Sequence, residues 1–305
     1  MAKTKLVIIT GPTATGKTGL AVEVARRLGG EIISADSMQV YRRFDIGAAK
    51  PSAEELAAAP HHLISICEPY EDYTAARFVS DAAQKIEEIR GRGAVPIVAG
   101  GTGLYIKALT AGLLDAPSAD DALRAELLLM ADELGREAVH ARLRAVDPAS
   151  AKAIHPNNLR RVIRAIELTT LMGAPVSEAR GEHGFAEEPY DTFKIGLSME
   201  RAAMYAAIDA RVDRMMEAGL VREVRGLLAD YGAALKPMAG LGYKEITGYL
   251  TGAYSLDEAV SLIKMNTRHY AKRQVTWFKR DTEIKWFSIG RKDAIIDVVK
   301  GFLKP

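Results

Sequence analysis

Two glycines, a lysine and a threonine near the N-terminus have the types and spacing of a phosphate-binding loop. Gly11, Gly16, Lys17 and Thr18 form the pattern G-x-x-x-x-G-K-T within KLVIITGPTATGKT (5–18). The glycines let backbone N–H groups turn toward a compact anion, and the positive end of the following helix faces the same point. The lysine adds a full positive charge, and the threonine hydroxyl is a suitable Mg²⁺ ligand. The chemistry indicated is the binding of a phosphate or diphosphate.

Asp36 is the first candidate for catalysis, because it ends a short strand expected over residues 31–36. Ligands of parallel α/β sheets gather at the carboxyl ends of the strands, so Asp36 should face the same crevice as Lys17. A carboxylate opposite a bound phosphate suits metal ligation or removal of a proton from a nucleophile. Capping of the next helix is the alternative interpretation.

The sequence Gly100-Gly101-Thr102-Gly103 follows another buried strand, expected over residues 95–99. Small residues at this edge of the sheet would allow a ligand to approach closely. The Thr102 hydroxyl could also donate a hydrogen bond to a developing charge. A plain tight turn is the competing interpretation.

The elements around these residues alternate between strand and helix. An apolar run over 6–10 precedes the first loop, and apolar residues at helical spacing follow it as far as Gly29 and Gly30. Further expected elements are a weak strand over 62–66, a helix over 75–90 and strands over 193–197 and 284–288. This alternation predicts an α/β fold with a P-loop NTPase-like parallel sheet core.

Between about residues 117 and 191 the apolar residues follow helical spacing, with no convincing strand. The predicted organisation is therefore a catalytic core over 1–116 and 192–305, with C-terminal helices, interrupted by a helical insertion over 117–191.

Composition limits the class of protein. The chain has 305 residues, 48% hydrophobic and 26% charged, and a net charge of only +2. A single cysteine, Cys67, excludes disulfides within the chain and a cysteine-rich zinc module. No apolar run has the length of a membrane span, and the N-terminus lacks a signal-peptide pattern. We expect a cytoplasmic protein without a membrane partner or an obligate protein partner.

Basic residues gather in two segments. Arg160, Arg161 and Arg164 share one face of an expected helix. The second segment combines aromatic and basic side chains: Lys264, Arg268, Tyr270, Lys272, Arg273, Trp277, Phe278, Lys279, Arg280 and Lys285. This composition suits an RNA surface, although a charged stripe is usually a solvated helix face. Arg124 and Arg211 are isolated, and the residues alone would place them on the surface.

Short motifs follow one another along nearly the whole chain: GPTATGKT (11–18), DSMQVY (36–41), DIGAAKP (45–51), PHHL (60–63), GGTGLY (100–105), PSADDALR (117–124), HPNNLRRVIRAIE (155–167), GLGYKE (240–245) and AKRQVTWFKR (271–280). In this order they resemble the bacterial tRNA dimethylallyltransferases, also called IPP transferases. The resemblance implies transfer of the dimethylallyl group from dimethylallyl diphosphate to N6 of adenosine 37, next to the anticodon, in tRNAs that read codons beginning with U.

The resemblance also implies a role for individual residues. The diphosphate, with Mg²⁺ on Thr18, would lie on Gly11, Pro12, Thr13, Ala14, Thr15, Gly16, Lys17 and Thr18. Asp36 would act as general base on the adenine amine, and Thr102 and Arg211 would steady the departing diphosphate. The anticodon stem-loop, with its target base flipped out, would contact Asp36, Ser37, Met38, Gln39, Thr102, Arg124, Arg160, Arg161, Arg164, Gly240, Gly242, Tyr243, Lys272, Arg273, Gln274, Trp277 and Lys279.

Two positions depart from the family pattern. Thr15 stands where many members have serine, and Gly103 stands where others carry a larger residue. We expect neither departure to touch a proposed role.

Three other functions are compatible with parts of this pattern. A small-molecule kinase would bind ATP on the loop and use Asp36 to activate a hydroxyl. A prenyltransferase acting on free adenine nucleotides would keep the chemistry without RNA. A non-enzymatic RNA-binding protein is least favoured, because it has no use for a phosphate loop opposite an acid.

Overall fold

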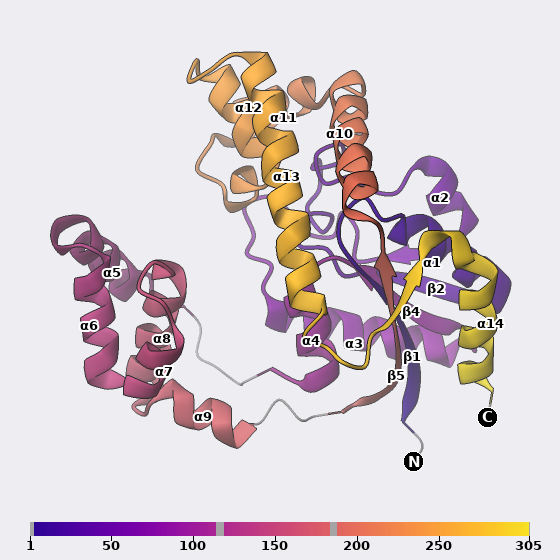
Figure 1. The fold of residues 1–305 in the computed structure, drawn as a ribbon, viewed down its shortest axis with the longest axis horizontal. Coiled ribbons are helices and arrows are strands. Elements are labelled where there is room, and N and C mark those ends of the chain that lie inside the picture. Colours follow the sequence, from indigo (N-terminus) through magenta and orange to yellow (C-terminus); the bar gives the residue numbers. More distant parts are fainter. Residues whose placement is uncertain (1–2, 114–118, 184–187, 305) are drawn as a thin grey trace. The chain divides into compact units, whose positions relative to one another are not determined.

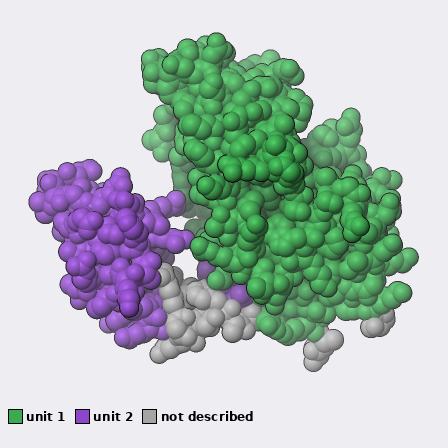
Figure 2. All heavy atoms as spheres, in the orientation of Figure 1, with its two compact units in different colours: residues 1–110, 188–305 green, residues 111–187 purple. Residues whose placement is uncertain are grey.

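The computed structural model describes residues 3–113, 119–183 and 188–304. The chain divides into two compact units, Met1–Thr110 with Glu188–Pro305, and Ala111–Glu187, which Figure 2 draws in different colours. The expected boundary at 116–117 lies outside the described residues. At the other boundary, strand β5 already begins at Tyr190, so residues 190 and 191 belong to the sheet.

The described residues of the first unit form a six-stranded sheet in the order β3-β2-β4-β1-β5-β6. Its strands are β1 (Thr4–Thr10), β2 (Gly30–Ser34), β3 (His61–His62), β4 (Val95–Gly100), β5 (Tyr190–Ser198) and β6 (Lys285–Ser288). All pairings are parallel, which confirms the predicted α/β class.

Helices cover both faces of this sheet (Figure 1). They are α1 (Lys17–Leu28), α2 (Ala53–Ala58), α3 (Ala75–Gly91), α4 (Gly103–Ala111), α10 (Arg201–Glu217), α11 (Leu220–Tyr231), α12 (Tyr243–Leu250), α13 (Leu256–Phe278) and α14 (Lys292–Leu303), with 3-10 helices η1 (Lys236–Ala239) and η2 (Ile289–Arg291). In β1, Leu6 and Ile8 join the core with α3, α4 and α11 to α13. Val7 and Ile9 face α1 and α14 instead. Burial on both faces explains why β1 reads as a continuous apolar run.

The expected strand over 62–66 is wrong beyond its first residue, because β3 ends at His62. Leu63 and Ser65 adopt left-handed φ angles of 62° and 53°, which interrupt an extended chain. The backbone N–H groups of Ser65 and Ile66 donate hydrogen bonds to the carbonyls of Gln39 and Val40. This apolar segment therefore supports the loop after Asp36.

The second unit contains helices α5 (Asp121–Leu134), α6 (Arg136–Val146), α7 (Pro148–Ala153), α8 (Leu159–Met172) and α9 (Val176–His183). It has an apolar core of its own, in which Leu127, Val139, Leu143 and Val162 are fully buried. Over the described residues of both units, no helix combines the length and apolar character that a membrane crossing requires.

A buried carboxylate, Glu167, ties two helices of the second unit together. Its Oε1 lies 2.8 Å from Arg124 Nε on α5 and accepts a hydrogen bond from the backbone N–H of Asp120. Arg164, one turn earlier on α8, donates to Oε2. Burial alone would raise the pKa of Glu167, but these hydrogen bonds hold it below its usual value.

We expect Glu167→Gln to lower the free energy of unfolding by about 2 kcal/mol at neutral pH, the scale of lost charge-assisted hydrogen bonds. Because the pKa of Glu167 is lowered in the folded state, its ionised form stabilises the fold above the ordinary carboxyl pKa, and this contribution is lost as the pH falls. Urea unfolding followed by circular dichroism should show the difference between wild type and variant shrinking toward pH 4. Glu178→Gln, at an exposed position on α9, is the control. A constant difference across this pH range would contradict the assignment.

Candidate active site

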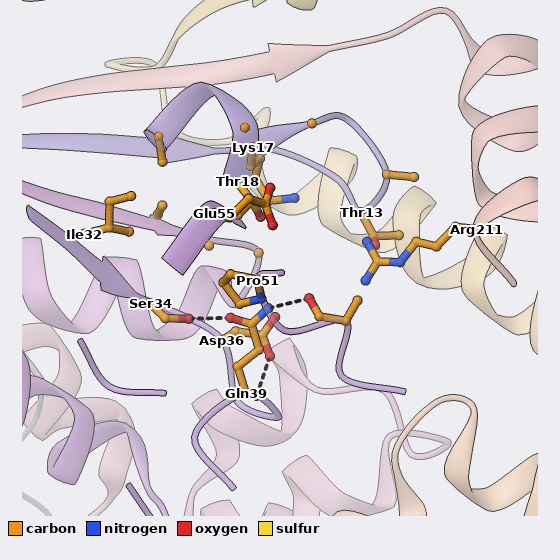
Figure 3. A pocket seen from close by; sticks show the side chains of 18 of the residues that line it. Thr13, Lys17, Thr18, Ile32, Ser34, Asp36, Gln39, Pro51, Glu55 and Arg211 are labelled. Carbon is orange, nitrogen blue, oxygen red and sulfur yellow. Dashed lines mark hydrogen bonds between the residues drawn. The ribbon is translucent and has the colours of Figure 1, made fainter. Parts of the chain in front are cut away.

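A cavity of about 460 Å³ lies at the carboxyl ends of the central strands (Figure 3). The loop after β1 contributes Thr13, Lys17 and Thr18, while Asp36 follows β2. The end of β4, α10 and α13 complete the wall. This is the edge at which parallel α/β sheets bind ligands.

The loop after β1 is shaped by its own hydrogen bonds. Pro12 O accepts the Thr15 hydroxyl at 2.8 Å and Lys17 Nζ at 2.7 Å. Gly16 takes a left-handed φ of 80°, and α1 then begins without a side-chain cap or an acid in its first turn. The first N–H groups of a helix need partners and can bind an anion. The residues at this helix start, Gly16, Lys17 and Thr18, line the cavity.

Two cations from different elements converge on this cavity. Lys17 lies at the start of α1, and Arg211 reaches in from α10 (Figure 3). Burial, repulsion from Arg211 and an opposing effect of Asp36 together lower the pKa of Lys17 to about 7. Burial also lowers the pKa of Arg211. The residues alone suggested a surface position for Arg211, but its half-buried side chain lines the cavity. A bound anion would relieve the repulsion between Arg211 and Lys17.

Asp36 uses its two carboxylate oxygens differently. Oδ1 accepts hydrogen bonds from the backbone N–H groups of Met38 at 2.8 Å and Gln39 at 3.2 Å. No described residue donates to Oδ2, although Asp36 lines the cavity. Capping and catalysis are thus compatible, because one oxygen holds a turn while the other remains available to a substrate.

The neighbours of Asp36 are also tied to the protein. Gln39 Oε1 accepts the Ser34 hydroxyl at 2.8 Å, and its Nε2 donates to the Ala49 carbonyl at 3.0 Å. The Ser37 N–H donates to Thr102 Oγ1 at 3.1 Å, which joins the glycine-rich loop to the Asp36 turn. The Thr102 hydroxyl proton therefore remains available for a substrate, whereas the Gln39 amide already has partners.

The glycines of the glycine-rich loop leave room for neighbouring parts of the protein. A Cβ on Gly100 would lie 2.2 Å from the Ala35 carbonyl oxygen, and one on Gly101 would lie 2.4 Å from Gln274 Nε2. One on Gly103 would lie 2.2 Å from Trp277 Nε1. Gly100 and Gly101 also line the cavity, so the expected close approach of a ligand at these glycines stays a prediction. Gly103 also touches a residue with a proposed role, contrary to expectation.

The second basic segment separates into two groups. Lys264 and Arg268 pair with Asp213 and Asp209 on α10, at 2.6 Å and 3.0 Å, and Lys285 lies over the Phe193 ring. Within the described part of the chain, no carboxylate pairs with the exposed residues Lys272, Arg273, Lys279 and Arg280. This second group is available to a nucleic acid.

The remaining residues expected to contact RNA differ in whether their side chains are exposed or already bound to the protein. In the second unit, Arg160 and Arg161 are exposed, whereas Arg124 and Arg164 are held by Glu167. In the first unit, Gly240 lies against the Met38 side chain, and Gly242 donates its N–H to Glu245.

Tyr243 is fully buried, so its side chain has no surface to offer RNA. Its hydroxyl donates to Glu223 and accepts the N–H of Ala48. Glu223 in turn accepts the N–H groups of Ile46 and Gly47. Tyr243 and Glu223 thus hold the segment whose next residue, Ala49, binds Gln39. Any effect of Tyr243 on RNA would pass through this segment.

Several lining residues were missed by sequence reasoning. They are Glu55, His61, Arg214 and Tyr270. Arg214 follows Arg211 by one helical turn, so the i, i+3 rule could have found it once Arg211 was placed. No local pattern marks Glu55 or His61 as a lining residue. Tyr270 was expected within the second basic segment, as part of an RNA surface, and lines the cavity instead.

Two family models match this chain. The model described as IPP transferase covers residues 39–281, and the one described as isopentenyl transferase covers residues 4–64. A tRNA dimethylallyltransferase of Geobacter metallireducens is 53% identical over 98% of both chains. One of Geobacter sulfurreducens is 54% identical over 93% of this chain and 92% of the relative.

Solved structures agree with these relatives. A tRNA isopentenylpyrophosphate transferase from Bacillus halodurans superposes with a TM-score of 0.74, at 42% identity over 98% of this chain and 96% of the other. A eukaryotic dimethylallyltransferase acting on tRNA gives a TM-score of 0.84, at 28% identity over 98% and 79% of the two chains. The motifs, the fold and these likenesses agree, and the chain belongs to the IPP transferase family, whose members transfer a prenyl group.

Proposed function

We propose that this enzyme transfers the dimethylallyl group from dimethylallyl diphosphate to N6 of adenosine 37 in tRNAs that read codons beginning with U. One observation carries the proposal: a phosphate loop, the half-buried Arg211 and the available Oδ2 of Asp36 share one cavity. The names of the relatives support tRNA as the acceptor.

Different residues of the cavity have different roles in the reaction. Asp36 Oδ2 takes a proton from the N6 amine as the nitrogen bonds to C1 of the dimethylallyl group. The bond between C1 and the diphosphate oxygen breaks at the same time. Lys17 and Arg211 then stabilise the charge that develops on the diphosphate, and Thr102 contributes a hydroxyl donor. A flipped adenosine is required, because a stacked base cannot reach a cavity.

The proposed Mg²⁺ would be held by the Thr18 hydroxyl, which lines the cavity beside Lys17. Within the described residues, no cluster of three or more His, Cys, Asp or Glu side chains could hold a metal by itself. A hydroxyl oxygen suits a hard cation that takes its remaining oxygen ligands from diphosphate and water. When bound, the ion supplies charge neutralisation that improves the leaving group.

Incubation of the purified chain with labelled dimethylallyl diphosphate and tRNA, AMP or ATP tests the proposal. We expect label in tRNA alone, and nuclease mapping should place it at adenosine 37. Label in AMP or ATP would indicate a prenyltransferase of free nucleotides. Transfer of phosphate from labelled ATP, without prenyl transfer, would indicate a kinase.

The exposed basic residues should set the salt dependence of tRNA affinity. We expect Arg160→Ala/Arg161→Ala and Lys272→Ala/Arg273→Ala each to lower the slope of log affinity against log salt, by roughly one unit for each lost phosphate contact. Affinity for dimethylallyl diphosphate should not change, because these side chains are not among those that line the cavity. Filter binding at several salt concentrations measures the slope.

The control for this measurement is Lys300→Ala, an exposed lysine on α14. Unchanged slopes in both double variants would show that these residues are solvated surface and that RNA binds elsewhere.

A further inference from the structure

Gln274 joins two loops of the active site through one side chain. It lies on α13 and is only 6% exposed. Its Oε1 accepts the backbone N–H of Thr13 at 2.8 Å, and its Nε2 donates to the carbonyl of Gly101 at 2.9 Å. A buried carboxamide with both ends engaged is a rigid spacer, because each end would cost free energy if left unpaired.

The two partners of Gln274 belong to loops that have different roles in the proposed reaction. Thr13 is part of the phosphate loop, next to Ala14 with its left-handed φ of 65°. Gly101 precedes Thr102, whose hydroxyl accepts the Ser37 N–H beside Asp36. A single side chain thus links the diphosphate loop to the turn that carries the general base.

Glycines in the neighbouring loop leave room for the side chains of helix α13. A Cβ on Gly101 would lie 2.4 Å from Gln274 Nε2, so only glycine leaves room for the amide. Three residues later on the same helix, Trp277 lies against Gly103 in the same way. Helix α13 is therefore fitted to the glycine-rich loop at two successive turns.

We propose that Gln274 is a positioning residue that fixes the diphosphate loop relative to Asp36, rather than a direct contact to RNA. This inference rests on the proposed function and deepens it. Lys272 and Arg273 lie on the same helix and are exposed. The helix that presents charge to RNA is thus also the one that sets the geometry of the phosphate loop.

Gln274→Met removes both hydrogen bonds at nearly constant length. We expect kcat to fall by about 10²-fold, the cost of a displacement near 1 Å between reacting groups, and KM for dimethylallyl diphosphate to rise. Affinity for tRNA should stay at the wild-type value. Calorimetry with dimethylallyl diphosphate and filter binding with tRNA separate the two effects, and Thr276→Val, an exposed position on α13, is the control.

Gln274→Glu tests the hydrogen-bond pattern itself. An ionised carboxylate can accept from Thr13 but repels the Gly101 carbonyl, whereas a protonated carboxyl can both donate and accept. The rate of this variant relative to wild type should therefore increase as the pH falls. A role in packing alone would give a ratio independent of pH and would overturn the proposal.

The remaining outcomes are also decisive. Loss of tRNA affinity in Gln274→Met, with diphosphate binding and single-turnover rate intact, would make Gln274 an RNA contact and refute positioning. Weaker diphosphate binding in that variant supports positioning even if the wild-type chain fails to prenylate tRNA. Failure of the proposed function is thus distinguishable from failure of this inference.

Discussion

Replacement of Asp36 by asparagine should lower the single-turnover rate of prenyl transfer by about 10²–10⁴-fold, the usual contribution of a positioned proton acceptor. Asparagine keeps an Oδ1 that can accept the N–H groups of Met38 and Gln39, so the turn should remain. It places an NH₂ group where the available Oδ2 stands, and this group cannot take a proton from N6. Folding and the affinities for both substrates should therefore be preserved.

Rapid-quench measurements with enzyme in excess over tRNA give the rate, and binding assays give the two affinities. Asp257→Asn, at an exposed position on α13, controls for loss of a negative charge. A rate near that of wild type in Asp36→Asn would remove this carboxylate from the proton transfer. Loss of tRNA binding in proportion to the rate would instead make it a recognition residue.

Replacement of Lys17 by methionine, or of Thr18 by valine, should lower kcat/KM for dimethylallyl diphosphate by about 10²–10³-fold, the cost of one lost group that stabilises developing charge. Lys17 is half-buried and lines the cavity with Arg211, and Thr18 is the second residue of α1 and lines the same cavity. Affinity for tRNA should survive, because the exposed basic residues proposed to bind RNA belong to α13, the two positions after it, and the second unit.

The measurement pairs steady-state kinetics in the diphosphate with filter binding of tRNA. Lys300→Met serves as the matched lysine control on α14. If both variants lose tRNA affinity as severely as activity, the loop contributes to RNA binding and the proposed separation of the two sites is incorrect.

Local sequence patterns were sufficient for the phosphate loop and for the class of fold. The apolar run of β1, the glycines and Lys17 act within one strand–loop–helix unit, so neighbouring residues determine the result. The buried strand β4 was predictable for the same reason. The segment 62–66 failed because its geometry depends on hydrogen bonds to Gln39 and Val40, more than twenty positions away in the sequence.

Charges were the least predictable part of the site. Lys264, Arg268 and Lys272 look equivalent along the sequence, yet the first two are neutralised by aspartates on α10 and the third is exposed. Arg211 could not be recognised for a different reason: an isolated arginine shows no sequence pattern, although its side chain lines the cavity. Only the packing of α10 against α13 distinguishes these cases.

The position of β1 in the sheet has a consequence for biosynthesis. Residues Val7–Thr10 of this central strand pair with β4. The other edge of β1 pairs with β5, which begins only at Tyr190 and is therefore synthesised much later. While the ribosome makes the second unit, the growing chain carries a strand with an unpaired backbone edge and apolar side chains, the kind of segment that promotes aggregation. The second unit closes its own core from contacts within one continuous segment, so it can fold during this interval. The order of synthesis thus makes the nascent chain most vulnerable while its catalytic half is still incomplete.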